Sequence, residues 1–315
     1  MCGIAGLWAR SHHPETVIRA EKMADALYHR GPDGRGFHID ARNALAMIHT
    51  RLSIIGLNAG DQPIFGRESD GTGGMVLTAN GEFYDYKRIR GLLRTDGYDF
   101  NTKSDSELAI KLYHKHGLDF VHHLRGEFAF AIFDEAKQQL ILVRDRFGIR
   151  PLFCHVGEAG VFWGSEIKAM LAHPDVPREL DPRAQLHQMM QVMVPGMTLW
   201  KGIEAVKPGH MLIVSRDGDG FAVEERRYWD ADFPLDGEHD ELPDEEHIEN
   251  VRKALVESIA LRLEADVPVA CYLSGGIDSC SILGMAAAIQ QSPVKAFTIG
   301  FDDARYDETS IATEM

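Results

Sequence analysis

Short runs of hydrophobic residues, separated by glycine, asparagine and aspartate, dominate the first two thirds of the chain. Runs of this length that end at turn-forming residues are typical of buried β-strands. The pattern predicts strands at 45–49, 75–79, 128–133, 140–143 and 161–163.

Two segments instead repeat their hydrophobic residues at a helical spacing. In 17–28 and in 104–116, hydrophobic side chains recur every three or four positions, which places them on one face of a helix. Several strands combined with a few helices predict a layered α+β domain, which we assign to residues 1–229.

The pattern changes after residue 229. Residues 230–246 are acidic, contain proline and show no periodicity, which is typical of an exposed linker. Beyond it, the pattern predicts an amphipathic helix at 248–263, a buried strand at 268–273, a helix at 276–290 and a second strand at 294–301. This order predicts a parallel α/β unit with a right-handed crossover.

The second domain, at 247–315, has few elements for its class. Another helix is expected from about residue 307, but two strands form a sheet too small to be covered on both faces. We therefore expect an incomplete parallel α/β domain in this sequence.

Composition excludes several kinds of partner. The chain has 33 Lys+Arg against 48 Asp+Glu, so its net charge of -15 repels nucleic-acid phosphates and anionic lipids. No segment approaches the roughly 18 consecutive apolar residues of a membrane span, and no basic segment followed by an apolar one opens the chain. We expect no nucleic-acid or membrane partner and a cytoplasmic location.

Cys2 is notable for its position in the opening Met-Cys-Gly. Removal of Met1 would leave Cys2 with both its thiol and a free α-amine. A thiol with a pKa of about 8.5 beside an amine with a pKa of about 7.7–8.0 is a nucleophile with its own base. Taken alone, however, an early cysteine is more often structural. The four cysteines are scattered, without the spacing of a metal site or a disulfide framework.

A series of motifs begins with the segment that contains Cys2 and continues along the sequence. They are Met-Cys-Gly-Ile-Ala-Gly at 1–6, His-Arg-Gly-Pro-Asp-Gly at 29–34, Arg-Leu-Ser-Ile-Ile at 51–55, Asn-Gly-Glu at 80–82, Ser-Asp-Ser-Glu at 104–107, Arg-Asp-Arg-Phe-Gly-Ile-Arg-Pro-Leu at 144–152, Ser-Glu-Ile-Lys-Ala at 165–169 and Pro-Gly-His at 208–210. Together they resemble the class II glutamine amidotransferases of the glutamine-hydrolysing asparagine synthetase B type, over essentially the whole chain. The resemblance implies an N-terminal-nucleophile sandwich of α/β/β/α layers in which Cys2 opens a strand.

The resemblance also implies roles for single residues. Arg51 would bind the α-carboxylate of glutamine as a bidentate fork, and Asp105 would bind its α-ammonium. Asn80 and Gly81 would form the oxyanion hole, although Asn-Gly without this context is typical of a turn. Further glutamine contacts are implied at Leu52, Ser53, Ile54, Ile55 and Glu82. We interpret residues 144–152 as structural support for a strand and a turn. Glutamine hydrolysis at Cys2 is expected to need no cofactor.

The segment Ser-Gly-Gly-Ile-Asp-Ser at 274–279 lies between a predicted strand and a predicted helix. Backbone N–H groups at such a junction can hold an anion. The segment resembles the pyrophosphate loop of ATP-pyrophosphatase domains, which implies ATP and Mg²⁺ as cofactors and an acyl-AMP intermediate. The implied ATP-binding residues are Leu273, Ser274, Gly275, Gly276, Asp278, Ser279 and Ile299, with Asp278 also contacting the metal.

We therefore expect a glutamine-dependent amide synthetase that uses glutamine, ATP and a carboxylate acceptor, with aspartate as the default acceptor. A homodimer is also possible. A glutamine phosphoribosyl or sugar-phosphate amidotransferase would share the first domain but not the loop at 274–279. The sequence is also compatible with a truncated stand-alone glutaminase, a glutamine-sensing module or an amidotransferase for a different carboxylate. The family's acceptor-binding region lies outside this sequence, so the acceptor stays open.

Overall fold

The computed structural model describes residues 1–315 except 58–59, 67–73, 193, 236 and 238–241. The chain divides into two compact units, Met1–Ala231 and Asp232–Met315, and each is described by itself. In the described part of the chain, no helix is both long and apolar enough to cross a membrane.

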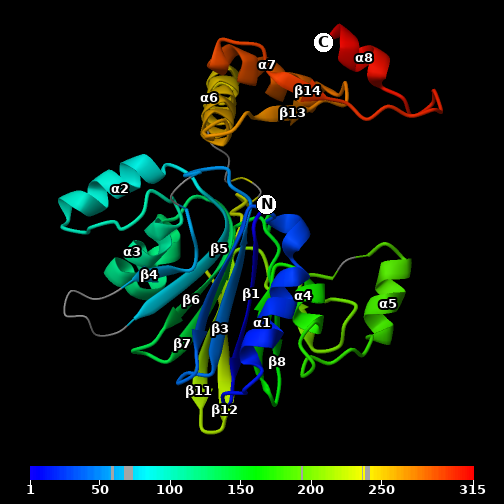
Figure 1. Cartoon of the computed structure of the whole chain (residues 1–315). Coiled ribbons are helices and arrows are strands. Elements are labelled where there is room, and N and C mark those ends of the chain that lie inside the picture. The colour runs from blue at the N-terminus through cyan, green and yellow to red at the C-terminus, as the bar shows by residue number, and fades with distance from the viewer. Residues whose placement is uncertain (58–59, 67–73, 193, 236, 238–241) are drawn as a thin grey trace. The chain divides into compact units, whose positions relative to one another are not determined.

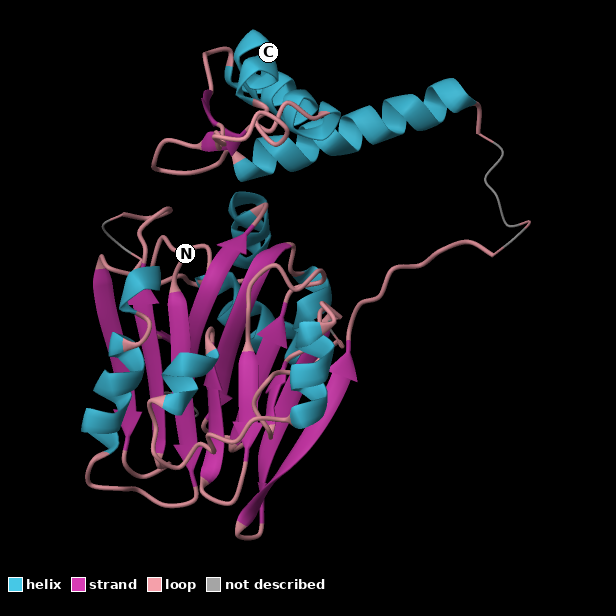
Figure 2. Ribbon diagram, turned by 90° about the vertical axis from the view of Figure 1, so that its right-hand side faces the viewer, coloured by secondary structure: helices cyan, strands magenta, loops and turns pink. Residues whose placement is uncertain are grey.

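Two six-stranded antiparallel sheets form the centre of the first unit (Figure 1, Figure 2). The first sheet has the order β10 (Ile203–Ala205), β8 (Phe153–Val156), β9 (Gly160–Gly164), β1 (Gly3–Ala9), β3 (Leu45–Arg51) and β2 (Gly34–Asp40). The second has the order β12 (Gly220–Arg227), β11 (His210–Asp217), β7 (Gln139–Arg144), β6 (Gly126–Asp134), β5 (Met75–Phe83) and β4 (Ile64–Gly66). All five strands predicted from hydrophobic runs are confirmed.

The central strands are buried on both faces, which explains their unbroken hydrophobic runs. Along β1, Ile4 and Trp8 lie in the core between the sheets, whereas Ala5 and Leu7 lie in a second core beneath helices. Side chains alternate in this way because successive residues of a strand point to opposite faces. Trp8 packs edge-on against Phe133 of β6 with ring centroids 5.1 Å apart, which links the two sheets.

Helices cover the outer faces of the two sheets. The first sheet is covered by α1 (Thr16–Asp25) and α4 (Ile167–Leu171), with η1 (Tyr28–Arg30) between α1 and β2 in the chain. The second is covered by α2 (Tyr86–Thr95), α3 (Glu107–His116) and η2 (Gly117–His123). A further helix, α5 (Pro182–Met189), is capped by the side chain of Asp181. The predicted α/β/β/α layering is thus confirmed.

The second unit contains α6 (Asp244–Arg262), β13 (Ala270–Tyr272), α7 (Ile277–Gln290), β14 (Lys295–Phe297) and α8 (Thr309–Glu314). The two strands pair in parallel, as the order of elements predicts. Helix α6 begins within the predicted linker, and its acidic first turn is favourable at the positive end of the helix dipole. Residues 236 and 238–241 of that linker lie outside the described residues.

The strand predicted at 268–273 exists, but the prediction that it is buried is wrong. The strand β13 is shorter than predicted, and the side chain of Tyr272 is 82% exposed, as is 59% of Phe297 on β14. A two-stranded sheet that packs on α7 has little covered surface, so its apolar side chains stay in water.

Candidate active site

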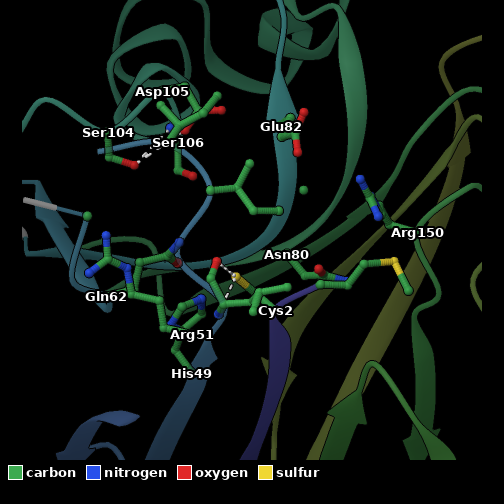
Figure 3. Close-up of a pocket in the computed structure, with 16 residues that line it drawn as sticks. Cys2, His49, Arg51, Gln62, Asn80, Glu82, Ser104, Asp105, Ser106 and Arg150 are labelled. Carbon is green, nitrogen blue, oxygen red and sulfur yellow. Dashed lines mark hydrogen bonds between the residues drawn. The ribbon is translucent and has the colours of Figure 1, made fainter. Parts of the chain in front are cut away.

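One pocket in the first unit gathers nearly all the residues predicted to bind and hydrolyse glutamine (Figure 3). It is lined by Met1, Cys2, His49, Arg51, Leu52, Ile54, Ile55, Gly60, Gln62, Asn80, Gly81, Glu82, Ser104, Asp105, Ser106 and Arg150. Ser53 is the one predicted residue missing from this lining. Its backbone N–H instead donates to the Asp33 carboxylate at 2.8 Å.

The thiol of Cys2 lies against the backbone of Leu52, directly before β1 begins. The Leu52 N–H donates to the sulfur at 3.4 Å, and the Leu52 carbonyl oxygen lies 3.5 Å from it. Burial raises the pKa of the Cys2 thiol, although the hydrogen bond from Leu52 and the charges of Arg51 and Arg150 oppose the shift. The thiol therefore keeps its proton at neutral pH, and a base must remove it before attack.

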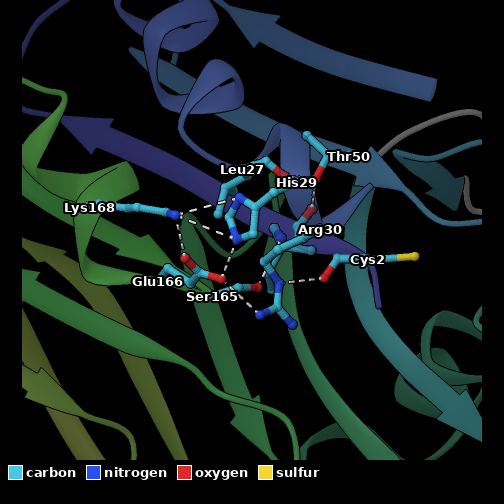
Figure 4. A network of polar contacts seen from close by, with 10 residues as sticks. Cys2, Leu27, His29, Arg30, Thr50, Ser165, Glu166 and Lys168 are labelled. Carbon is cyan, nitrogen blue, oxygen red and sulfur yellow. Dashed lines mark hydrogen bonds and ion pairs between the residues drawn. The ribbon is translucent and has the colours of Figure 1, made fainter. Parts of the chain in front are cut away.

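The carbonyl of Cys2 is held by a network that joins two motifs far apart in the sequence (Figure 4). Arg30 Nε donates to Cys2 O at 2.9 Å, and Arg30 Nη1 donates to Glu166 at 3.0 Å. Glu166 also contacts His29 at 2.9 Å and Lys168 at 3.1 Å. Burial opposes the ionisation of Glu166, but these hydrogen bonds outweigh it and keep its pKa below the usual value.

Strand β5 carries Asn80 and Gly81 into the pocket wall, so the Asn-Gly pair lies within a strand and not in a turn. The Asn80 side chain is buried, and neither of its amide atoms has a hydrogen-bond partner among the described residues. An unpaired buried amide costs free energy, so this one is suited to a ligand group. Gly81 has a φ of +150°, and a Cβ there would lie 2.0 Å from Glu127 O. Only glycine fits at this position.

Two charged groups lie at the part of the pocket predicted to hold the free amino-acid end of glutamine. The Asp105 carboxylate accepts the Phe83 N–H at 2.7 Å, and burial raises its pKa. The Arg51 guanidinium donates to Gly56 O at 2.7 Å and pairs with the exposed carboxylate of Asp61 at 3.2 Å. A substrate carboxylate at Arg51 would compete with Asp61.

The segment 144–152, which we interpreted as structural support, also contributes Arg150 to the pocket lining. Its backbone N–H donates to Asp145 at 2.9 Å, which folds the turn back toward the site, and its guanidinium pairs with Glu127 at 3.4 Å. His49 is another pocket residue that the motifs did not predict. It lies two residues before Arg51 on β3, and the period of two along a strand is a signal that could have found it.

In the second unit, the predicted ATP loop connects β13 to the N-terminus of α7. The Ser279 hydroxyl accepts the Ser274 N–H at 3.2 Å and lies 3.1 Å from the Ser274 hydroxyl. Gly275 has a φ of +77°, which favours glycine. A loop of this shape at the start of a 14-residue helix fits a phosphate group.

The remaining predicted nucleotide residues differ in exposure. Leu273 is buried, whereas the Ile299 side chain is 66% exposed and Asp278 is exposed on the first turn of α7. The described residues contain no group of three or more His, Cys, Asp or Glu side chains arranged for a metal ion.

Known proteins resemble this chain in both parts. A family model described as a glutamine amidotransferase domain matches residues 1–229, and one described as asparagine synthase matches residues 250–315. Amidase chyE of Penicillium rubens is 38% identical over 99% of this chain and 48% of that protein. Amidase chry2 of Gibberella zeae is 37% identical over 99% and 49%. The glutamine-hydrolyzing asparagine synthetase 3 of Bacillus subtilis is 32% identical over 96% and 48%.

The chain thus spans about half the length of these curated relatives. Among solved structures, the glutamine phosphoribosylpyrophosphate amidotransferase of B. subtilis has a TM-score of 0.52 at 19% identity, covering 94% of this chain and 65% of that chain. An allosteric regulatory enzyme of purine biosynthesis has a TM-score of 0.53 at 20% identity, with the same coverage. At such identities the likeness shows the fold alone, and it agrees with the predicted sandwich of α/β/β/α layers. The chain belongs to the glutamine amidotransferase family, with homology to asparagine synthases in its second unit.

Proposed function

We propose that the chain hydrolyses glutamine at Cys2 and serves as the glutaminase part of a glutamine-dependent amide synthetase, in which the ammonia is passed to a carboxylate activated by ATP. The observation that supports glutamine hydrolysis most directly is that one pocket contains the Cys2 thiol, the backbone of Gly81 and an Asn80 amide that has no hydrogen-bond partner among the described residues. A nucleophile beside unused donors suits acyl transfer from an amide.

In the proposed mechanism, removal of Met1 frees the α-amine of Cys2, which takes the thiol proton. The sulfur attacks the carboxamide carbon of glutamine, and the negative oxygen accepts hydrogen bonds from the Asn80 amide and the Gly81 N–H. The amine passes its proton to the departing nitrogen, and ammonia leaves. Water then attacks the thioester, which releases glutamate and restores the thiol. No cofactor is needed for these steps.

Recognition of glutamine would rest on opposite charges in the pocket lining. Arg51 would hold the α-carboxylate, and Asp105, with Glu82 beside it in the lining, would hold the α-ammonium. A bound ammonium would also favour the ionised form of Asp105, whose pKa burial raises.

In the synthetic half, the loop at 274–279 would hold the pyrophosphate of ATP, with Mg²⁺ reached through Asp278. When bound, ATP would activate the acceptor carboxylate as an acyl-AMP. We propose aspartate as the acceptor because asparagine synthetases are among the relatives. A different carboxylate is the second candidate, favoured by the two fungal relatives named amidases. We propose a cytoplasmic location.

Thiol trapping tests the hydrolytic proposal. 6-Diazo-5-oxonorleucine, an electrophilic analogue of glutamine, should label Cys2 stoichiometrically, and the label should block glutamate formation. Excess glutamine should protect the thiol. Labelling at Cys154, Cys271 or Cys280 with unlabelled Cys2 would contradict the proposal.

A further inference from the structure

We propose that Gln62 is a positioning residue for glutamine hydrolysis, because its side-chain amide holds the backbone of Ala79 and thereby sets the position of Asn80 and Gly81. This inference rests on the proposed function of the pocket. Gln62 lines the pocket, and its side chain comes from the segment between β3 and β4 (Figure 3).

The pairing of β4 with β5 explains why a side chain is needed at this place. Ile64 pairs with Leu77 and Phe65 pairs with Val76 in antiparallel register, and extending this register by two residues places Gln62 opposite Ala79. Strand β4 begins only at Ile64, so its backbone does not pair with β5 beyond Leu77. Ala79, two residues further along the same edge of β5, therefore has no backbone partner from β4.

The Gln62 side-chain amide supplies both a donor and an acceptor to the backbone of Ala79. Ala79 N–H donates to Gln62 Oε1 at 2.6 Å, and Gln62 Nε2 donates to Ala79 O at 3.2 Å. The residue is 9% exposed, so water does not readily replace either bond. A primary amide reproduces the one donor and one acceptor of a neighbouring peptide group.

The backbone of Gln62 is itself confined by the other sheet. Gly36 on β2 lies so close that a Cβ there would be 1.7 Å from Gln62 O. The side chain thus extends from a backbone that is fixed against the first sheet to β5 in the second sheet. Such a fixed origin is what a positioning residue requires.

The consequence for catalysis follows from the position of Asn80. Its amide has no hydrogen-bond partner among the described residues, so its direction depends on the backbone of β5. One edge of β5 is held by β6, where Asn80 pairs with Ala129 and Gly81 pairs with Phe128. The other edge is held next to these residues by Gln62. Loss of this contact would let the oxyanion donors shift, which weakens transition-state binding more than substrate binding.

The test is the pH dependence of Gln62→Glu. A neutral carboxylic acid has a donor and an acceptor like the amide, whereas a carboxylate can only accept and would face Ala79 O. We expect kcat for glutamine hydrolysis to fall roughly 10- to 100-fold at pH 8 with KM changed by less than about 3-fold, and the ratio of variant to wild-type kcat to recover as the pH falls. Gln62→Leu should lose kcat at every pH without recovery.

Matched controls are Gln185→Glu and Gln185→Leu on the exposed face of α5, which should follow the wild type throughout. Tryptophan fluorescence reports whether each variant is folded. If Gln62→Glu does not fold, Gln62→Asn replaces it, since a shorter amide keeps both groups but does not reach Ala79, and it too should lose kcat and keep KM.

Three outcomes overturn the proposal. An active wild type with Gln62 variants of unchanged kcat removes Gln62 from the mechanism and leaves the proposed function intact. Equal losses in Gln62→Glu and Gln62→Leu without pH recovery show a structural role only. A wild type that does not hydrolyse glutamine removes the proposed function and this inference together.

Discussion

Single residues in the pocket carry polar groups that the fold leaves unused. Asn80 presents a buried amide without a partner among the described residues, and His49 presents a buried Nε2 in the same state. A buried polar group without a partner costs free energy, so ligand binding gains from each one that it satisfies.

Replacing Asn80 tests its predicted role as an oxyanion donor. Asn80→Ala should lower kcat for glutamine hydrolysis by roughly 10²- to 10³-fold, because the bond it removes strengthens in the transition state. KM should change little. The exposed Asn101→Ala is the control, and steady-state glutamate release is the measurement. A rise in KM alone, with kcat intact, would assign Asn80 to substrate binding.

The protonation of His49 links the pocket to stability. Burial lowers its pKa from 6.5 to about 3, opposed by a hydrogen bond with the Ala79 backbone and reinforced by the Arg51 charge. In the unfolded chain His49 therefore binds a proton below about pH 6.5, whereas in the folded chain it stays neutral down to about pH 3. The free energy of unfolding thus falls as the pH falls through this window.

Between pH 7.5 and pH 5.5, His49 should account for about 1.4 kcal/mol of lost stability. All four tryptophans, at positions 8, 163, 200 and 229, lie in the first unit, so their fluorescence in urea reports this unit. His49→Leu should lose about 1.4 kcal/mol less than the wild type over this range, whereas the exposed His12→Leu should not differ. Equal losses in all three proteins would show that His49 is protonated in the folded state.

At the scale of elements, the strands of the first unit that the sequence predicted from hydrophobic runs are buried on both faces. The hydrophobic pattern did not predict strands β2 and β12, because each lies at the edge of its sheet and has exposed side chains. The motifs predicted Cys2, Asn80 and Asp105 as site residues, and all three line the pocket. Gln62 and Arg150 could not, because they reach the pocket through contacts with Ala79 and Asp145 that no local pattern records.

The geometry of β5 can be tested at Gly81. Gly81→Ala places a Cβ 2.0 Å from Glu127 O, which forces β5 and β6 apart. We expect a loss of stability of about 1–3 kcal/mol and a lower kcat. Gly91→Ala on α2, where a Cβ meets nothing within 4 Å, is the control and should gain about 0.5–1 kcal/mol. A Gly81→Ala protein with native stability would mean that the strand pairing is looser than described.

At the scale of the whole molecule, the two units differ in how well they bury their apolar side chains. The first has three clusters of buried residues, whereas the second leaves Tyr272, Ile277 and Phe297 largely exposed. The predicted nucleotide residues Asp278 and Ile299 are exposed as well. A nucleotide on this surface would keep much contact with water, which is unfavourable for binding and for alignment of a second substrate.

We therefore expect the 315-residue chain to form glutamate and ammonia from glutamine without releasing pyrophosphate from ATP. The measurement is pyrophosphate release with Mg²⁺, aspartate and ammonia, beside glutamate release in the same samples. Ser274→Ala, which removes a hydroxyl from the loop, should leave glutamate release unchanged. Robust pyrophosphate release would show that the exposed loop binds and uses ATP as it stands.

The proposed hydrolysis depends most directly on Cys2 acting as an N-terminal nucleophile with its own α-amine as base. Glutamate release should therefore be compared between chains that begin at Cys2 and chains in which Met1 is retained, with the N-terminus of each verified by mass spectrometry. The processed chain should hydrolyse glutamine, and the chain that retains Met1 should be inactive because its Cys2 nitrogen is an amide without basicity. Normal hydrolysis by the chain that retains Met1 would contradict the account.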